Sequence, residues 1–227
     1  MARNENPPFE RGLTAYNGAT IDPNNLFGFQ DVGKDWLFED VDPNLKTQRT
    51  NAYVRCRVVR NVSGGALLPK LLVVYQTSNS PAGGTGQNDP TQTFGSEISG
   101  YSVGDGLAPQ ASNITVPVDE FLPVAGVPNN DCFWVVVEGP AMCRTSVAGP
   151  AVNINVGDKV VAASTSDTHS TTAGRVDAVQ YATTTAANST TARQDVRQDA
   201  DFVGYALSAA TTGATDTPIL VYIVSHL

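Results

Sequence analysis

Short runs of apolar and β-branched residues, separated by Gly, Pro, Asn and Ser, recur from Ala52 to the end of this chain. Such runs are typical of β-strands separated by turns. No segment carries a convincing 3.6-residue apolar period of the kind that marks an amphipathic helix. The sequence therefore predicts an all-β fold, an antiparallel β-sandwich or barrel preceded by an extended N-terminal arm.

Two runs carry the clearest strand signals. Tyr53–Val59 alternates, so Arg55 and Arg57 are expected on the outer face and the apolar side chains between them in the core. Cys132–Val137 is apolar throughout, and we expect Gly139-Pro140 to end that strand in a sharp turn. The remaining strands are expected at Leu71–Tyr75, in a hairpin-like pair with the first run, and at Ile98–Val103, Ile114–Val118, Met142–Val147 (as the partner across the Gly-Pro turn), Lys159–Ala163, Arg175–Tyr181, Phe202–Ala209 and Ile219–Val224. The last strand is apolar on both faces and is expected to be covered on both sides.

Residues 1–48 differ from the rest because they combine prolines and no regular period with many aromatic residues. Disordered segments are usually poor in aromatics, so these rings are expected to pack either on the chain's own domain or on a neighbouring subunit. The aromatic residues of this segment are Phe9, Tyr16, Phe27, Phe29, Trp36 and Phe38. We predict three units: the arm (1–48), a β domain with long loops (49–140) and a C-terminal β-barrel-like domain (141–227).

Charge is sparse and unevenly placed. The chain has 14 basic and 22 acidic residues, a net charge of −8, and only 16% charged residues. This balance argues against binding nucleic acid, whose phosphates need a basic surface. Basic residues, including Arg55 and Arg57, dominate between Pro43 and Asn88, and acids dominate from there to Cys143. The two segments either form complementary surface patches that favour association or neutralise each other within one subunit.

The residues that could carry chemistry form no convincing catalytic or cofactor site. The two histidines, His169 and His226, lie in a Thr/Ser-rich loop and at the penultimate position, where nothing would orient a catalytic base. Adjacent carboxylates at 119 and 120 point apart in an extended chain and are expected to cap a turn. The acids Glu39, Asp40 and Asp42 could hold Ca²⁺ but lack the calcium-loop pattern, which favours a solvated turn.

The remaining signals place the chain in a reducing, aqueous compartment. Its three cysteines are odd in number and have no C-x-x-C spacing, so we expect reduced thiols, with Cys56 in the core. The first residues lack the apolar segment of a signal peptide, and no stretch approaches the roughly 18 apolar residues of a membrane span. We therefore expect no enzyme activity, no metal, no cofactor and no membrane partner.

Several runs from about residue 49 onward resemble structural proteins of tailed bacteriophages. Arg60–Lys70 (RNVSGGALLPK) is similar to a recurring turn of those proteins. Val118–Pro123, Gly126–Asp131 and Phe133–Pro140 together resemble a second signature, VDEYLP…GVP..D.FWVVVEGP. The C-terminal half, with Val156-Gly157-Asp158, Gly174-Arg175-Val176 and Val203-Gly204-Tyr205-Ala206-Leu207, is similar in layout to phage head decoration proteins. The resemblance implies a cement protein on the outside of the capsid, commonly trimeric, with no catalytic residue.

The sequence thus leads to one main hypothesis and two alternatives. The main hypothesis is a virion protein, assembled in host cytoplasm, that binds the major capsid protein on the capsid exterior and cements neighbouring capsomers. Its candidate partner-binding residues are Phe27, Phe29, Trp36, Phe38, Arg55 and Arg57. A receptor- or carbohydrate-binding virion appendage, such as a fibre or head spike, would be favoured by aromatics exposed on loops. A β-fold hydrolase would need a pocket around His169.

Overall fold

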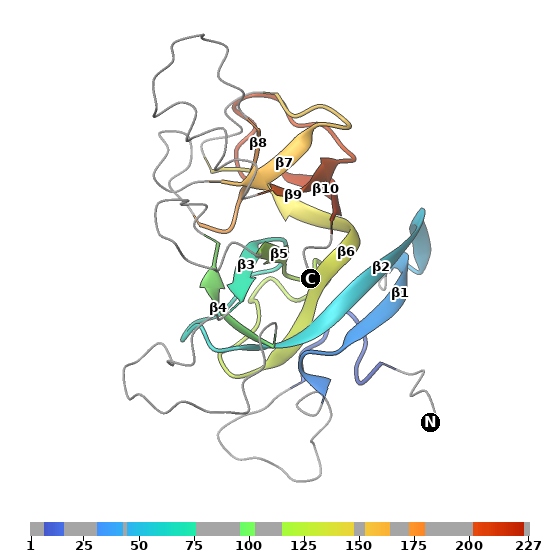
Figure 1. Cartoon of the computed structure of the whole chain (residues 1–227), viewed down its shortest axis with the longest axis vertical. Coiled ribbons are helices and arrows are strands. Elements are labelled where there is room, and N and C mark those ends of the chain that lie inside the picture. The colour runs from blue at the N-terminus through green and yellow to red at the C-terminus, as the bar shows by residue number, and fades with distance from the viewer. Residues whose placement is uncertain are drawn as a thin grey trace.

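The computed structural model describes residues 7–15, 31–42, 45–75, 96–102, 115–147, 153–163, 173–179 and 202–224 (Figure 1). Within these ranges the chain forms strands and no helix, which confirms the all-β prediction. The strands are β1 (Asp35–Asp42), β2 (Thr47–Asn61), β3 (Leu72–Tyr75), β4 (Glu97–Tyr101), β5 (Thr115–Pro117), β6 (Cys132–Arg144), β7 (Lys159–Ala162), β8 (Val176–Ala178), β9 (Phe202–Ala206) and β10 (Pro218–Ile223).

All ten strands belong to one sheet that is mostly antiparallel. The order along it is β5-β3-β4-β2-β6-β10-β9-β7-β8, and β1 pairs with β2 beside this path. The pairing of β2 with β4 is parallel. β4 therefore separates β3 from β2, and the expected hairpin-like pair of these two strands is wrong.

The long strand β6 joins the two halves of the molecule. Figure 1 shows it running from the group that contains β1 to β5 to the group that contains β7 to β10. At each end of the sheet, an isolated β-bridge outside the strand ladders connects the edge of the sheet back to β6 or to the residue that follows it. Val118, just after β5, bridges to Val135, and Thr145 bridges to Val176 in β8. Each half therefore curls around its own interior as a small barrel, and β6 is common to both.

Two hydrophobic clusters follow from this arrangement. The smaller cluster fills the first barrel and takes Phe133, Val135 and Val137 from β6. The larger cluster fills the second barrel and continues onto the other face of β2 and β6, where Trp134 lies beside Val54 and Val58. Because a strand turns successive side chains to opposite faces, the continuous apolar run of β6 supplies both clusters.

Gly139-Pro140 does not end the strand, contrary to the sequence-based expectation. β6 continues through both residues to Arg144, so the first half of the segment expected to be its partner strand, Met142–Arg144, belongs to β6 itself. The pair instead marks the place where β6 leaves β2 and begins to pair with β10: Glu138 faces Arg55, and Gly139 faces Ile223. The predicted division between residues 140 and 141 therefore falls inside one continuous strand.

The two ends of the chain also differ from the expected pattern. Part of the predicted arm is regular, because β1 forms an antiparallel hairpin with β2. The final strand is covered on one face rather than on both. Ile219, Val221 and Ile223 are buried, but Tyr222 between them is exposed.

The crossover at Gly139 gives a prediction about stability. Gly139 has φ +102°, and a Cβ there would lie 2.5 Å from the carbonyl oxygen of Tyr53. We expect Gly139→Ala to lower the free energy of unfolding by about 3 kcal/mol or more, since conformational strain and backbone overlap add. Gly157→Ala is the matched control, because Gly157 has φ +92° with open space around it; it should cost only about 1 kcal/mol. Equal losses in urea unfolding would contradict the close approach.

Candidate functional site

The aromatic residues of the N-terminal segment that the structure describes pack on the chain's own domain. Trp36 and Phe38 in β1 make edge-to-face contacts with Trp134, with ring centroids 5.4 and 5.1 Å apart. Phe9 lies 5.0 Å from the same ring, and its carbonyl oxygen accepts a hydrogen bond from the indole Nε1 of Trp134 at 3.2 Å. Trp36 and Phe38 are half-buried. Phe27 and Phe29 lie outside the described residues.

An ion pair fixes the beginning of the described chain to the same domain. Arg11 Nη2 and Nε donate to Asp119 Oδ1 at 2.8 and 3.2 Å, and the amide of Gly12 donates to Asp119 Oδ2 at 2.8 Å. Both side chains are almost completely buried. Burial alone would lower the pKa of Arg11, but the neighbouring acidic groups, Asp119 foremost, together outweigh it and raise that pKa above its ordinary value. The guanidinium therefore stays charged and holds residues 7–15 in place.

A second guanidinium joins β1, β2 and the turn after β5. Arg49 Nη2 donates to Asp40 Oδ1 at 2.7 Å, and Arg49 Nη1 lies 2.7 Å from the carboxylate of Glu120. Thr50 adds a hydrogen bond to Asp40 at 2.7 Å. Burial raises the pKa of Glu120 although Arg49 lowers it, so desolvation is the larger effect.

This network corrects two expectations from the sequence. Asp40 is fully buried rather than part of a solvated turn, and Asp119 and Glu120 are buried ion-pair partners rather than simple turn caps. Asp119 and Glu120 do point to different cations, as expected of adjacent residues in an extended chain. No local pattern indicates these pairings, because Arg11 and Asp119 lie 108 positions apart in the chain.

Arg55 and Arg57 lie on the face of β2 opposite Val54, Cys56 and Val58, as the alternation predicts. That face is not the outer one, because Arg57 is the register partner of Val135, which belongs to the cluster inside the first barrel, and each arginine meets a carboxylate of the same chain. Arg57 donates two hydrogen bonds to Asp35 on β1, at 2.6 and 3.1 Å, and the pKa of Arg57 is raised chiefly by this contact. Arg55 lies 3.0 Å from Glu138 on β6. The Arg55–Glu138 pair joins the basic and acidic segments within one subunit, which is the alternative to complementary surface patches, whereas Asp35 comes from before the basic segment.

The motifs that carry the phage resemblance meet one another in space. Asn61, fully buried at the end of β2, donates through Nδ2 to the carbonyls of Gly65, Val127 and Pro128 at 2.8 to 3.1 Å. Leu67 and Val127 exchange backbone hydrogen bonds. The first motif (Arg60–Lys70) is therefore a turn whose shape is set by the side-chain amide of Asn61. The second motif (residues 118–140) contains the loop against which this turn packs.

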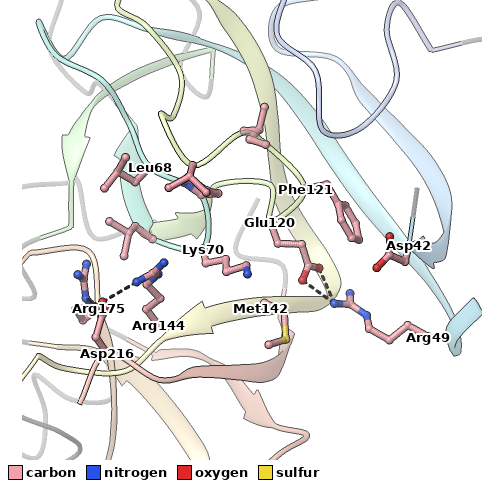
Figure 2. A pocket seen from close by; sticks show the side chains of 14 residues that line it. Asp42, Arg49, Leu68, Lys70, Glu120, Phe121, Met142, Arg144, Arg175 and Asp216 are labelled. Carbon is pink, nitrogen blue, oxygen red and sulfur yellow. Dashed lines mark hydrogen bonds and ion pairs between the residues drawn. The ribbon is translucent and has the colours of Figure 1, made fainter. Parts of the chain in front are cut away.

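An open groove of about 590 Å³ lies between the first motif and the C-terminal half (Figure 2). Its lining combines apolar residues with several charged ones. Arg144 Nη1 lies 2.6 Å from Asp216 Oδ2, and Arg175 Nε lies 2.9 Å from the other oxygen of the same carboxylate. Figure 2 shows Lys70 between this group and the Glu120–Arg49 pair. No local sequence pattern indicates the groove, because its lining residues come from seven separate segments.

Exposed tyrosines lie on strands rather than on loops in the described ranges. Tyr205 of β9 and Tyr222 of β10 are cross-strand partners, with 42% and 37% of their surfaces exposed. Tyr53 on β2 is 60% exposed and Leu37 on β1 is 65% exposed. These side chains form protruding apolar patches on a hydrogen-bonded framework.

Other chemistry-bearing groups are fixed in the core or lie outside the described ranges. Cys56, Cys132 and Cys143 are free thiols and buried, as expected, and burial raises the pKa of Cys56 to about 12. His169 and His226 fall outside the described residues. Across the described ranges, no three His, Cys, Asp or Glu side chains gather where they could hold a metal ion, and no helix there is long and apolar enough to span a membrane.

The chain was compared with known families and with curated proteins. No protein-family profile matches the chain, and a search of curated proteins finds no significant similarity.

The buried Arg11–Asp119 pair gives the second prediction. Arg11→Ala leaves Asp119 buried without its cation, so we expect the free energy of unfolding to fall by about 3–5 kcal/mol. Lys34→Ala is the control, because Lys34 pairs with Asp31 on the surface and should cost about 0.5 kcal/mol or less. The double variant Arg11→Ala/Asp119→Ala should lose less than the sum of the two single variants. A small loss for Arg11→Ala in urea unfolding would contradict docking of residues 7–15 in solution.

Proposed function

We propose that this chain is a virion structural protein that binds the major capsid protein on the outer capsid surface and cements neighbouring capsomers. It acts by binding rather than by catalysis, and neither nucleic acid nor a membrane is its partner. The proposal takes its class of protein from the resemblance of residues 60–70 and 118–140 to phage structural proteins. The single structural observation that supports it is the set of protruding apolar side chains on strands.

Those side chains fit a macromolecular partner better than a small ligand. Small molecules bind in concave apolar pockets, whereas protein partners meet on flatter patches in which tyrosines are enriched. Tyr205 and Tyr222 are opposite each other in the ladder, on antiparallel strands whose backbone groups are already paired, and the ring of Tyr205 packs edge-to-face on Phe202. Little ordering entropy is lost when such rigid residues are covered.

The structure also changes which residues we propose as contacts. Arg55 and Arg57 each face an internal carboxylate, and Trp36 and Phe38 pack on Trp134. Breaking these contacts to bind a shell would cost the free energy they contribute to folding. The tyrosine pair involves no such loss. The alternative of a carbohydrate-binding appendage was tied to aromatics on loops, and the exposed aromatics of the described ranges, Tyr53, Tyr205 and Tyr222, lie on strands.

The third prediction tests this surface. Particles of the virus that encodes the chain, stripped of it, should regain full occupancy when the purified wild-type protein is added. Tyr205→Ser/Tyr222→Ser should bind at least about tenfold more weakly, since two partly buried aromatic contacts contribute more than 1.4 kcal/mol together. Val156→Ser is the control, because Val156 is also exposed but lies in a turn. Unchanged occupancy of the double variant in cryo-EM maps would contradict this surface.

The fourth prediction concerns self-association. We propose that the chain forms homotrimers, a number that comes from the resemblance alone. A surface of low charge loses little solvation free energy when it is covered, and closed symmetric assembly is the usual outcome for self-complementary patches. Multi-angle light scattering at micromolar concentration should give three times the 23.9 kDa chain mass. A monomer in solution, together with isolated single copies in particle maps, would contradict the trimer.

A further inference from the structure

The groove between the first motif and the C-terminal half has an excess of positive charge at one end. Arg144 and Arg175 share the single carboxylate of Asp216. Lys70 lies next to them, since its carbonyl oxygen accepts a hydrogen bond from the Arg144 amide at 3.0 Å. Two guanidinium groups thus share one carboxylate, and Figure 2 shows the ammonium of Lys70 extending from beside them into the groove, in a chain whose net charge is −8.

None of the carboxylates in the described ranges neutralises this excess. Arg49 already engages both Glu120 and Asp40 at the opposite end of the groove. Lys70 has no carboxylate within ion-pair distance among the described residues, although Figure 2 shows Glu120 on its far side. Arg175 is nine-tenths buried, and its Nη1 has no hydrogen-bond partner in the described part of the chain.

The wall of the groove adjacent to these cations is apolar and open. Leu68 and Val124 have 41% and 86% of their surfaces exposed, and Phe121 and Leu122 line the same space. Leu68 and Val124 belong to the two loops that pack through Leu67 and Val127, so the wall is held by backbone hydrogen bonds. A volume of about 590 Å³ accommodates a few residues of an extended peptide and is within the usual range of binding pockets.

We propose that this groove binds an acidic peptide segment of a partner protein, with a carboxylate on Lys70 and Arg144 and a neighbouring apolar side chain against Leu68 and Val124. Hydrogen bonds between a carboxylate and cationic donors are stronger than neutral ones. Arg175 adds positive charge to the site without contacting the peptide directly. The inference is independent of the capsid proposal, since it rests only on the charges and walls of the groove.

The fifth prediction tests this inference with a defined probe. The probe is a blocked, fluorescein-labelled hexapeptide containing two glutamates and two leucines, titrated with the full chain and followed by fluorescence anisotropy. We expect saturable binding that weakens at high salt, because exposed charges are screened. Lys70→Gln should weaken it about tenfold, the loss expected for one charge-assisted contact. The same peptide with glutamines in place of glutamates should not bind measurably.

Lys46→Gln is the matched control, because both lysines have positive φ, 68° at Lys70 and 53° at Lys46, and Lys46 lies in the β1–β2 turn and does not line the groove. It should bind the peptide as the wild type does. If Lys70→Gln fails to fold, Val124→Ser tests the apolar wall and should weaken binding two- to threefold. Equal binding by Lys70→Gln and wild type, or equal binding of the glutamine peptide, would overturn the proposal. So would displacement by an equal concentration of inorganic phosphate, which would show that any anion is accepted.

Discussion

The burial of β6 on both faces is the constraint on which the rest of the structure depends. Phe133 and Val135 point into the first barrel, and Trp134 between them points to the opposite side. A tryptophan on the outside of a barrel requires a cover, and residues 7–15 and β1 provide it through Phe9, Trp36 and Phe38. The N-terminal segment is therefore part of the hydrophobic core in the ranges that the structure describes.

The N-terminal segment that covers Trp134 also buries charged side chains, and these side chains form ion pairs. Residues 7–15 bring Arg11 to Asp119, and the β1–β2 hairpin brings Asp40 and Arg49 to Glu120. Each carboxylate has lost most of its hydration, as the raised pKa of Glu120 indicates, and each is compensated by a guanidinium. Buried ion pairs contribute little net stability compared with apolar packing, but a mispaired one is costly. We infer that they select a single register for the N-terminal segment.

The sequence was sufficient for the fold class because local patterns determine it. Alternation at Tyr53–Val59 placed Val54, Cys56 and Val58 in the core, and all three are buried. β1 was not predicted because its pattern mixes polar and apolar residues on both faces: Asp40 is buried and Leu37 is exposed. The burial of these side chains is decided by partners distant in sequence. Gly139-Pro140 was misread because these residues most often end a strand; here they bend a strand that has another partner on its far side.

Candidate contact residues were harder to predict for the same reason. A charged residue is available to a partner only if no internal group binds it, and that depends on long-range pairing rather than on local sequence. Arg55 and Arg57 are flanked by apolar residues in a way that suggests an exposed basic strand, yet Glu138 and Asp35 lie opposite them. Lys70, at the end of a turn, is one of the cations of the described residues that form no internal ion pair, and it is the one of these that lines the groove. Most charges of the described chain are thus neutralised internally. The surfaces that remain available to a partner are the strand tyrosines and the groove. Contacts at these few places would be weak one by one, so strong attachment would require many copies acting together on a repetitive surface.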